Sequence, residues 1–226
     1  MDKRFLGIIG AIIIIFIGVF VISQKSNNNG STTTNSNSQP TSHTEGQNAK
    51  GVTLVEYGDY ECPICAEYNP AVVQVQQQFS KDILYQFRNL PLTQIHPNAF
   101  ASARAAEAAG LQNKYFEMNQ KLYDNQNDWV SATDPQTFFD TYAQQIGLNL
   151  TQFKSDYASS KVNDAINADL AAFNKTGQEM ATPSFFLDGQ YVPNSELVDS
   201  QTGAPSVSKF AAVINSEIAK KNPSAK

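Results

Sequence analysis

The only two cysteines of the chain, Cys62 and Cys65, frame a Cys-Pro-Ile-Cys motif that follows a short apolar run at residues 52–55. Proline is tolerated in the first turn of a helix, so the motif is predicted to open a helix at the end of a strand. A disulfide at this spacing closes a very short loop and contributes only about 2 kcal/mol through chain entropy, which strain easily offsets. The spacing therefore favours a redox pair, in which one thiolate attacks a disulfide and the other thiol resolves the mixed disulfide, over an inert cross-link.

A metal site is the competing use of two such thiols. A structural zinc ion takes about four ligands, and the chain can add only two histidines, His43 and His96. His43 falls in a segment that we expect to be disordered, and His96 stands at a predicted helix entry. We therefore expect no metal and no other cofactor.

Residues 5–22 are uncharged and almost wholly apolar, and Lys3 and Arg4 precede them. As a helix they would extend about 27 Å, close to the thickness of a bilayer core. The positive-inside rule places the N-terminus in the cytoplasm and the remainder outside. The prediction is a cytoplasmic stub and a single transmembrane anchor over residues 1–22, in the cell membrane. A signal peptide cleaved after Ser23 is the alternative.

Residues 23–50 are dominated by Ser, Asn, Thr, Gln and Gly and predict a disordered tether in which His43 is inert. Residues 51–226 are long enough for one domain with a sizeable core. The chain has 16 basic and 21 acidic side chains, for a formal charge of −5. Together with the lack of a basic cluster, this charge argues against nucleic acid as a partner.

Within residues 51–226 the apolar periodicity alternates between strand and helix. The predicted elements are, in order, a strand at 52–57, a helix at 62–79, a strand at 83–90, helices throughout 98–177, a strand pair at 184–187 and 191–192, and a helix from 206 to about 220. Asp188-Gly189 between the paired strands is a strong hairpin signal. This order is typical of an α/β, thioredoxin-like fold with an all-helical insertion.

Three stretches of the sequence together resemble one family. They are VEYGDYECPIC at residues 55–65, HPNA at 96–99 and ATPSFFLDG at 181–189. Their order and spacing, over about residues 51–220, resemble the DsbA-like thiol:disulfide oxidoreductases. The combination of CPxC with a downstream TPxF and DG is much more specific than either motif alone.

In this reading Cys62 is the nucleophile. The N-terminus of a helix offers partial positive charge and free N–H groups, and cysteines in such motifs have pKa values of roughly 3.5 to 7.5 against about 8.5 for a free thiol. Asp59 and Glu61 would oppose thiolate formation if they lay close to it. Cys65, one turn into the helix, is predicted to be more buried and to act as the resolving thiol.

Glu56 and the Thr182-Pro183 pair complete the predicted site. An inward-facing Glu56 would lie beneath the cysteines, and desolvation would raise its pKa and suit it to proton transfer with Cys65, the role that the resemblance implies. A solvated carboxylate at the strand edge is the alternative. The resemblance also implies that Pro183 is cis and that Thr182 presents its backbone to a substrate peptide; an ordinary trans proline is the alternative.

The predicted function is that of a membrane-tethered, extracytoplasmic thiol:disulfide oxidoreductase that introduces disulfides into exported proteins through a Cys62 mixed disulfide. A separate redox partner would re-oxidise the dithiol, and we expect a monomer. Two alternatives stay open. One is a reductase or isomerase with the same fold, and the other is a binding or chaperone-like module whose thiols are incidental.

Overall fold

The structure, a computed structural model, describes residues 39–223. The predicted anchor and most of the predicted tether therefore lie outside the described residues. Between residues 39 and 223 no helix has both the length and the apolar character to cross a membrane. The anchor at residues 5–22 stays a prediction.

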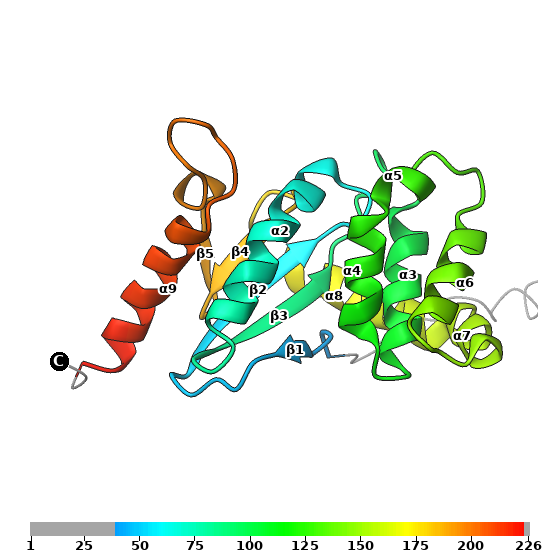
Figure 1. The fold of residues 1–226 in the computed structure, drawn as a ribbon, viewed down its shortest axis with the longest axis horizontal. Helices are drawn as coiled ribbons and strands as arrows, with labels where there is room; N and C mark the ends of the chain where they lie inside the picture. Colours follow the sequence, from blue (N-terminus) through cyan, green and yellow to red (C-terminus); the bar gives the residue numbers. More distant parts are fainter. Residues whose placement is uncertain (1–38, 224–226) are drawn as a thin grey trace, which may run out of the picture. The chain divides into compact units, whose positions relative to one another are not determined.

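A five-stranded sheet in the order β1-β3-β2-β4-β5 forms the centre of the domain (Figure 1). Strands β2 and β3 are parallel and joined by helix α2, whereas the other pairs are antiparallel. The strands are β1 (His43–Glu45), β2 (Val52–Gly58), β3 (Ile83–Asn89), β4 (Ser184–Leu187) and β5 (Gln190–Val192). The helices are α2 (Pro63–Gln78), α3 (Ala99–Gly110), α4 (Tyr115–Asp124), α5 (Gln126–Trp129), α6 (Gln136–Gln145), α7 (Leu150–Tyr157), α8 (Ser160–Asn174) and α9 (Val207–Lys221), with a 3-10 turn at Asn194–Glu196.

Strand β4 is buried on both faces, because helices cover both sides of the sheet. Phe185 faces α2 and α9, with its ring centroid 5.6 Å from that of Tyr68 and 5.1 Å from that of Phe210. The next residue, Phe186, faces the other way and lies 6.3 Å from Phe173 of α8. In Figure 1, α2 accordingly lies in front of the sheet and α8 behind it. Successive side chains of a strand point to opposite faces of the sheet, so these two phenylalanines pack the sheet against the helices on both of its faces.

The helical insertion is confirmed, since α3 to α8 occupy residues 99–174 between β3 and β4. Helix α3 lies against α4, α7 and α8, and its many alanines allow close approach of these helices. Trp129 belongs to the core of the insertion: its side chain is fully buried, and its indole N–H donates to the Leu122 carbonyl at 3.0 Å.

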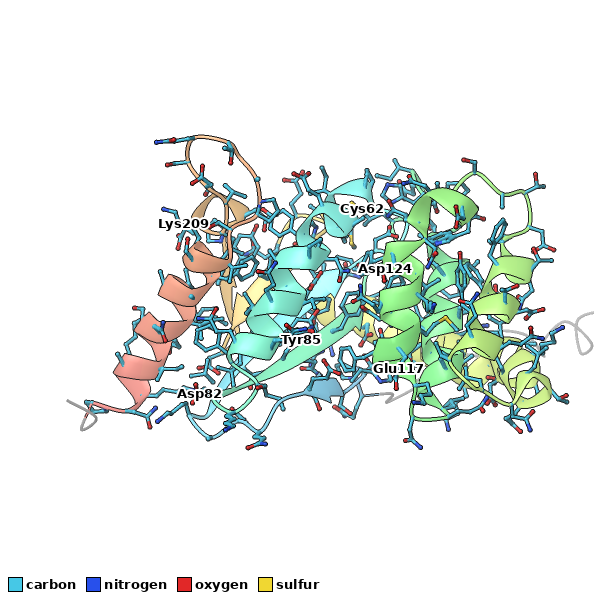
Figure 2. The ribbon with its side chains drawn as sticks, viewed as in Figure 1. Cys62, Asp82, Tyr85, Glu117, Asp124 and Lys209 are labelled. Carbon is cyan, nitrogen blue, oxygen red and sulfur yellow. The ribbon has the colours of Figure 1, made fainter. Side chains whose placement is uncertain are left out.

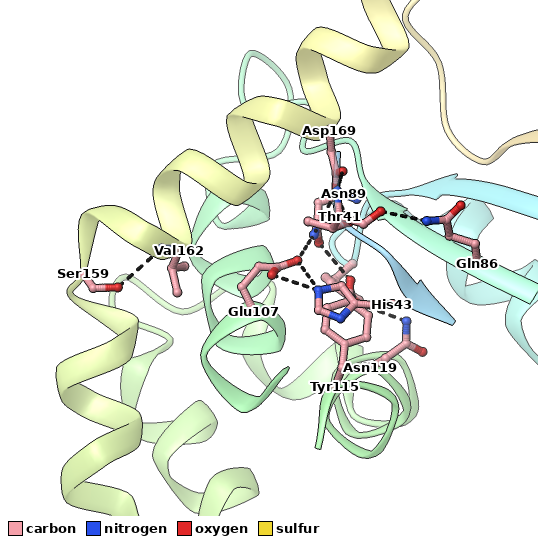
Figure 3. Close-up of polar contacts among 11 residues, drawn as sticks. Thr41, His43, Gln86, Asn89, Glu107, Tyr115, Asn119, Ser159, Val162 and Asp169 are labelled. Atoms are coloured by element: carbon pink, nitrogen blue, oxygen red, sulfur yellow. Dashed lines mark hydrogen bonds and ion pairs between the residues drawn. The ribbon is translucent and has the colours of Figure 1, made fainter. Parts of the chain in front are cut away.

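The folded domain begins before residue 51. Strand β1 pairs with β3 and forms one edge of the sheet, and two polar side chains of the same segment bind the insertion (Figure 3). Thr41 donates its N–H and its hydroxyl to Asp169 of α8, each at 2.7 Å. His43 Nε2 lies 2.9 Å from Glu107 Oε2, and the imidazole stacks on Tyr115 with centroids 3.6 Å apart. We call residues 39–45 the N-terminal clip.

The prediction that residues 39–50 belong to a disordered tether, with an inert His43, is therefore wrong. Composition alone suggested disorder, because polar residues bury little apolar area. In the fold these polar groups bind buried carboxylates that are distant in the sequence, and the composition of the segment itself gives no information about those partners.

Candidate active site

The two cysteines lie where strand β2 passes into helix α2. Cys62 is the N-cap of the helix, with extended backbone, and Pro63 is its first residue. Gly58 ends the strand, and a Cβ atom there would lie 2.6 Å from the ring of Phe87, so the close approach of these strands requires glycine. Figure 2 labels Cys62 at this end of α2, whereas Asp82 lies beyond the opposite end of the helix.

The two thiols differ sharply in acidity although they are one turn apart. Both are present as free thiols, with Cys62 5 % exposed and Cys65 fully buried. A hydrogen bond from Cys65, helped by Thr182 and by the backbone N–H groups of Ile64 and Cys65, outweighs desolvation and lowers the pKa of Cys62 to about 6. Burial, followed by the contact with Cys62, holds the pKa of Cys65 well above its usual range. At neutral pH the pair is therefore a Cys62 thiolate beside a protonated Cys65.

The loop before strand β4 lies against the dithiol. Its Thr182–Pro183 peptide bond is cis, as the resemblance implied. Cys62 Sγ lies 3.6 Å from the Thr182 carbonyl oxygen. The amide of Asn194 donates to the Pro183 carbonyl at 3.0 Å and fixes the loop from the far side. The role of Thr182 in substrate binding stays a prediction.

Glu56 faces inward from β2 and is 2 % exposed, so its predicted orientation is confirmed. Burial, only partly offset by a 2.6 Å hydrogen bond from the Tyr85 hydroxyl, raises the pKa of Glu56 to about 7. The charge of Glu56 in turn helps to raise the pKa of Cys65. A carboxyl that titrates near neutrality and is coupled to the buried thiol has the properties needed to exchange a proton with it. No pattern in the sequence indicated that Tyr85 would be the hydrogen-bond partner of Glu56.

Asp59 and Glu61 are buried close to the thiols, but other groups bind their carboxylates. Asp59 accepts hydrogen bonds from the Leu92 N–H at 2.9 Å and from His96 Nδ1 at 2.7 Å. Glu61 accepts from the Asn98 N–H, and burial raises the pKa of Glu61. The HPNA stretch thus anchors the turn that precedes Cys62, which gives His96 a structural role.

The described residues offer no ligand set for a metal ion. Between residues 39 and 223 no three side chains of the His, Cys, Asp or Glu type gather closely enough to hold one. His43 and His96 each bind a carboxylate, on different elements of the fold.

The sequence analysis missed a buried amide beside the dithiol. Gln126, the first residue of α5, donates from Nε2 to the carbonyl oxygen of Tyr60 at 2.8 Å and to that of Cys62 at 3.0 Å. Glutamine is common on helix surfaces, so nothing in the local sequence distinguishes this one. The fold alone brings the insertion to the backbone of Cys62.

An apolar cleft of about 670 Å³ adjoins the site and has no charged residue in its lining. Its exposed walls include Ile95, 69 % exposed, and Met180, 45 % exposed. Met180 lies two residues before Thr182, and Leu92 on the other wall donates to Asp59. The cleft lining comprises Pro91, Leu92, Thr93, Gln94, Ile95, Phe100, Asn167, Leu170 and Met180.

The sequence profile of the family described as Thioredoxin matches residues 38–213, which is most of the chain and includes the N-terminal clip. The chain belongs to the thioredoxin family. The matched span covers the dithiol, the insertion and the loop around Pro183, so these features belong to one family domain.

The curated relatives are much longer proteins. The chain is 39% identical over 157 residues to the Na(+)/H(+) antiporter NhaA 1 of Mycolicibacterium gilvum, a match that covers 66% of this chain and 23% of the relative. It is 34% identical to the NhaA 1 protein of Salinispora arenicola, covering 72% and 24% respectively. The chain therefore spans about a quarter of the length of these relatives.

Solved structures share the whole domain. The alpha-DsbA1 protein of Wolbachia pipientis superimposes with a TM-score of 0.66 at 21% identity, covering 84% of this chain and 96% of that one. BdbD from Bacillus subtilis, in its oxidised form, gives a TM-score of 0.65 at 19% identity, covering 80% and 96%. The thioredoxin-family domain thus has the DsbA-type fold, in which a helical insertion divides the thioredoxin unit.

Proposed function

We propose that the protein is a thiol:disulfide oxidoreductase that introduces disulfides into exported proteins through a Cys62 mixed disulfide. The observation that supports this proposal is the asymmetry of the two thiols: Cys62 has a pKa of about 6, and that of Cys65 is raised well above its usual range. A stable thiolate at Cys62 is a good leaving group, and a buried thiol at Cys65 resolves the intermediate from within.

In the oxidising direction, a substrate thiolate attacks Cys62 Sγ of the oxidised protein and breaks the Cys62–Cys65 bond. The electron pair of that bond goes to Cys65, which takes up a proton from Glu56. A second substrate thiolate then attacks the substrate sulfur of the mixed disulfide and releases the Cys62 thiolate. The substrate loses two electrons, and the protein ends as the dithiol, which is the form described here.

Substrate binding is supported by the surface around the dithiol. Ile64, between the two cysteines, is 47 % exposed, and the apolar cleft continues from Thr182 through Met180. An extended segment of an unfolded protein could pair with the backbone of Thr182 and place apolar side chains in the cleft.

The proposal includes the setting of this chemistry. A single transmembrane helix at residues 5–22 would hold the domain at the outer face of the cell membrane, where disulfides persist. A membrane or extracytoplasmic redox partner would re-oxidise the dithiol, and the protein would act as a monomer. Carbonate extraction, together with sequencing of the mature N-terminus, tests the anchor against a signal peptide.

The direction of the reaction is testable by redox titration against glutathione. Because the Cys62 thiolate stabilises the dithiol form, we expect a potential nearer about −120 mV than about −270 mV. A value at or below about −250 mV would instead favour the reductase or isomerase.

Trapping distinguishes an exchange enzyme from a chaperone-like module. Cys65→Ser should accumulate a mixed disulfide when it is mixed with a disulfide-bonded peptide: the Cys62 thiolate attacks one sulfur, the other leaves as a thiolate, and the resolving thiol is absent. Cys62→Ser should form none. Chaperone activity that survives in Cys62→Ser, with no exchange by the wild type, would support the binding module.

A further inference from the structure

Residues 59–62 form the turn that precedes helix α2 and ends at Cys62. This turn is bound largely by groups of the insertion and of the loop before it. Asp59 and Glu61 bind the loop that opens α3. The hydroxyl of Tyr60 donates to Tyr115 and accepts from Asn119, both on α4. These contacts fix side chains of the turn, and a further contact from the insertion binds its backbone carbonyls.

That contact is made by Gln126 at the start of α5. Its side chain is almost completely buried, with the residue 8 % exposed. The same amide nitrogen, Nε2, donates hydrogen bonds to the carbonyl oxygens of Tyr60 and Cys62, so both oxygens point toward one atom. The Cys62 carbonyl also accepts the first hydrogen bond of α2, from the Ala66 N–H at 3.2 Å. Gln126 therefore fixes the carbonyl at which the active-site helix begins.

A loss of this amide would disturb two buried carbonyl groups at once. The Tyr60 oxygen would keep no partner among the hydrogen bonds of the described residues, and a buried acceptor without a donor is costly. The two oxygens would also repel each other, because both carry partial negative charge. The expected relaxation is a rotation of the turn, which moves Cys62 relative to the N–H groups of Ile64 and Cys65.

We propose that Gln126 is a positioning residue through which the helical insertion holds Cys62 in its reactive orientation at the start of α2. The proposal rests on the role of Cys62 as the exchanging thiol. The hydrogen bonds of the Gln126 amide go to backbone carbonyls, so Gln126 acts through the backbone of the residue that carries the reacting sulfur. The insertion thereby contributes to thiol chemistry and does more than cover the sheet.

The test compares Gln126→Met with Gln86→Met in the full-length protein. Methionine matches the length of glutamine and donates no hydrogen bond. Gln86 is a matched control, because it is also 8 % exposed and its amide donates to a backbone carbonyl, that of Thr41, far from the dithiol. The readout is the pH dependence of Cys62 alkylation and of thiolate absorbance, with Cys65 replaced by serine in a parallel series.

For Gln126→Met we expect the pKa of Cys62 to rise by about one unit, because part of its hydrogen bonding is lost. Alkylation at pH 6 should fall roughly fivefold, in proportion to the thiolate fraction. Gln86→Met should lower the melting temperature and leave the pKa of Cys62 unchanged. The same pKa in Gln126→Met as in the wild type, or equal shifts in both variants, would overturn the proposal.

A second variant covers the case in which Gln126→Met does not fold. Gln126→Asn keeps both donors but draws the amide back by one methylene, so the shift should have the same sign and be smaller. An unchanged pKa in this folded variant would also overturn the proposal. Failure of the proposed function is recognised separately, because the wild type would then show no disulfide exchange whatever the result for Gln126.

Discussion

The dithiol site and the N-terminal clip both bury a carboxyl group, yet the two groups are suited to different tasks. Glu56 at the dithiol accepts one hydrogen bond, from Tyr85, and its pKa rises with burial to about 7. Asp169 at the clip accepts from Thr41 and Asn89 (Figure 3), and burial raises its pKa by a similar amount, from 3.8 to about 6.

The comparison teaches that two buried acids with similar pKa shifts can be used differently, because Asp169 is bound by several donors and Glu56 by one. Hydrogen bonds to the ionised form oppose desolvation, so a well-bonded carboxylate stays charged and anchors its neighbours. A carboxyl with a single donor keeps its proton close to neutral pH and can pass it on. The carboxylate at the clip therefore has the properties of a structural anchor, and the carboxyl at the dithiol site has those of a group that transfers protons.

Loss of the nucleophile should give the largest difference between the two regions. Cys62→Ser replaces a thiolate by a hydroxyl that is not ionised at pH 7, so disulfide exchange should fall on the order of a thousandfold or more. Stopped-flow exchange with a fluorescent cysteine peptide measures the rate. Clip variants are the control and should exchange at the wild-type rate; a similar loss in those variants would show that the two regions are not separate.

Removal of the proton donor should have the next largest effect. Glu56→Gln keeps the shape of the side chain and an acceptor for Tyr85, but it cannot supply a proton to Cys65. The step that expels Cys65 should slow roughly 300-fold at pH 7, within the usual range for general acids. Formation of the mixed disulfide from oxidised protein is the step to monitor. Wild-type kinetics in this variant would leave Glu56 with a structural role only.

The same carboxyl should make stability depend on pH. Its folded pKa of about 7 lies above the ordinary value of 4.5, so the folded state binds more protons between these values. The stability that this group contributes should therefore be fully present below about pH 4.5 and be lost as the pH rises through about 7, by about 3 kcal/mol at pH 7. Urea unfolding at several pH values should show a smaller decline for Glu56→Gln. An equal decline in wild type and variant would contradict the assignment.

At the clip, Asp169→Ala should destabilise the domain without altering exchange. The N–H groups of Thr41 and Asn89 would lose their buried acceptor, while relief of the buried charge offsets part of the cost. We expect a loss of about 2 kcal/mol in the free energy of unfolding. Urea denaturation measures this loss, and Thr41→Val, which removes only the hydroxyl, should cost less. An unchanged stability would mean that the clip does not depend on Asp169.

These two regions also mark what the sequence can and cannot reveal. The cysteine motif, the hairpin turn at Asp188-Gly189 and the Thr182-Pro183 loop are local patterns, and the structure places each of them as predicted. Gln126 lies 64 positions from Cys62, and Thr41 lies 128 positions from Asp169. Hydrogen bonds over such separations depend on tertiary packing of the insertion against the sheet, and single-sequence periodicity carries no information about it.

The smallest effect on stability is predicted for His43, and two variants separate the contributions of its two contacts. His43→Ala removes both the stack on Tyr115 and the contact with Glu107, and it should cost about 1 kcal/mol, because the ring is partly exposed and Glu107 keeps its hydrogen bond from Asn89. His43→Phe keeps the stack and removes the contact with Glu107, so its stability should lie between those of the alanine variant and the wild type. Hydrogen exchange of the β1 and β3 amides measures release of the clip at the level of single residues. Faster exchange confined to these strands would locate the effect in the clip, whereas loss of protection throughout the sheet would show that the N-terminal clip is integral to the core.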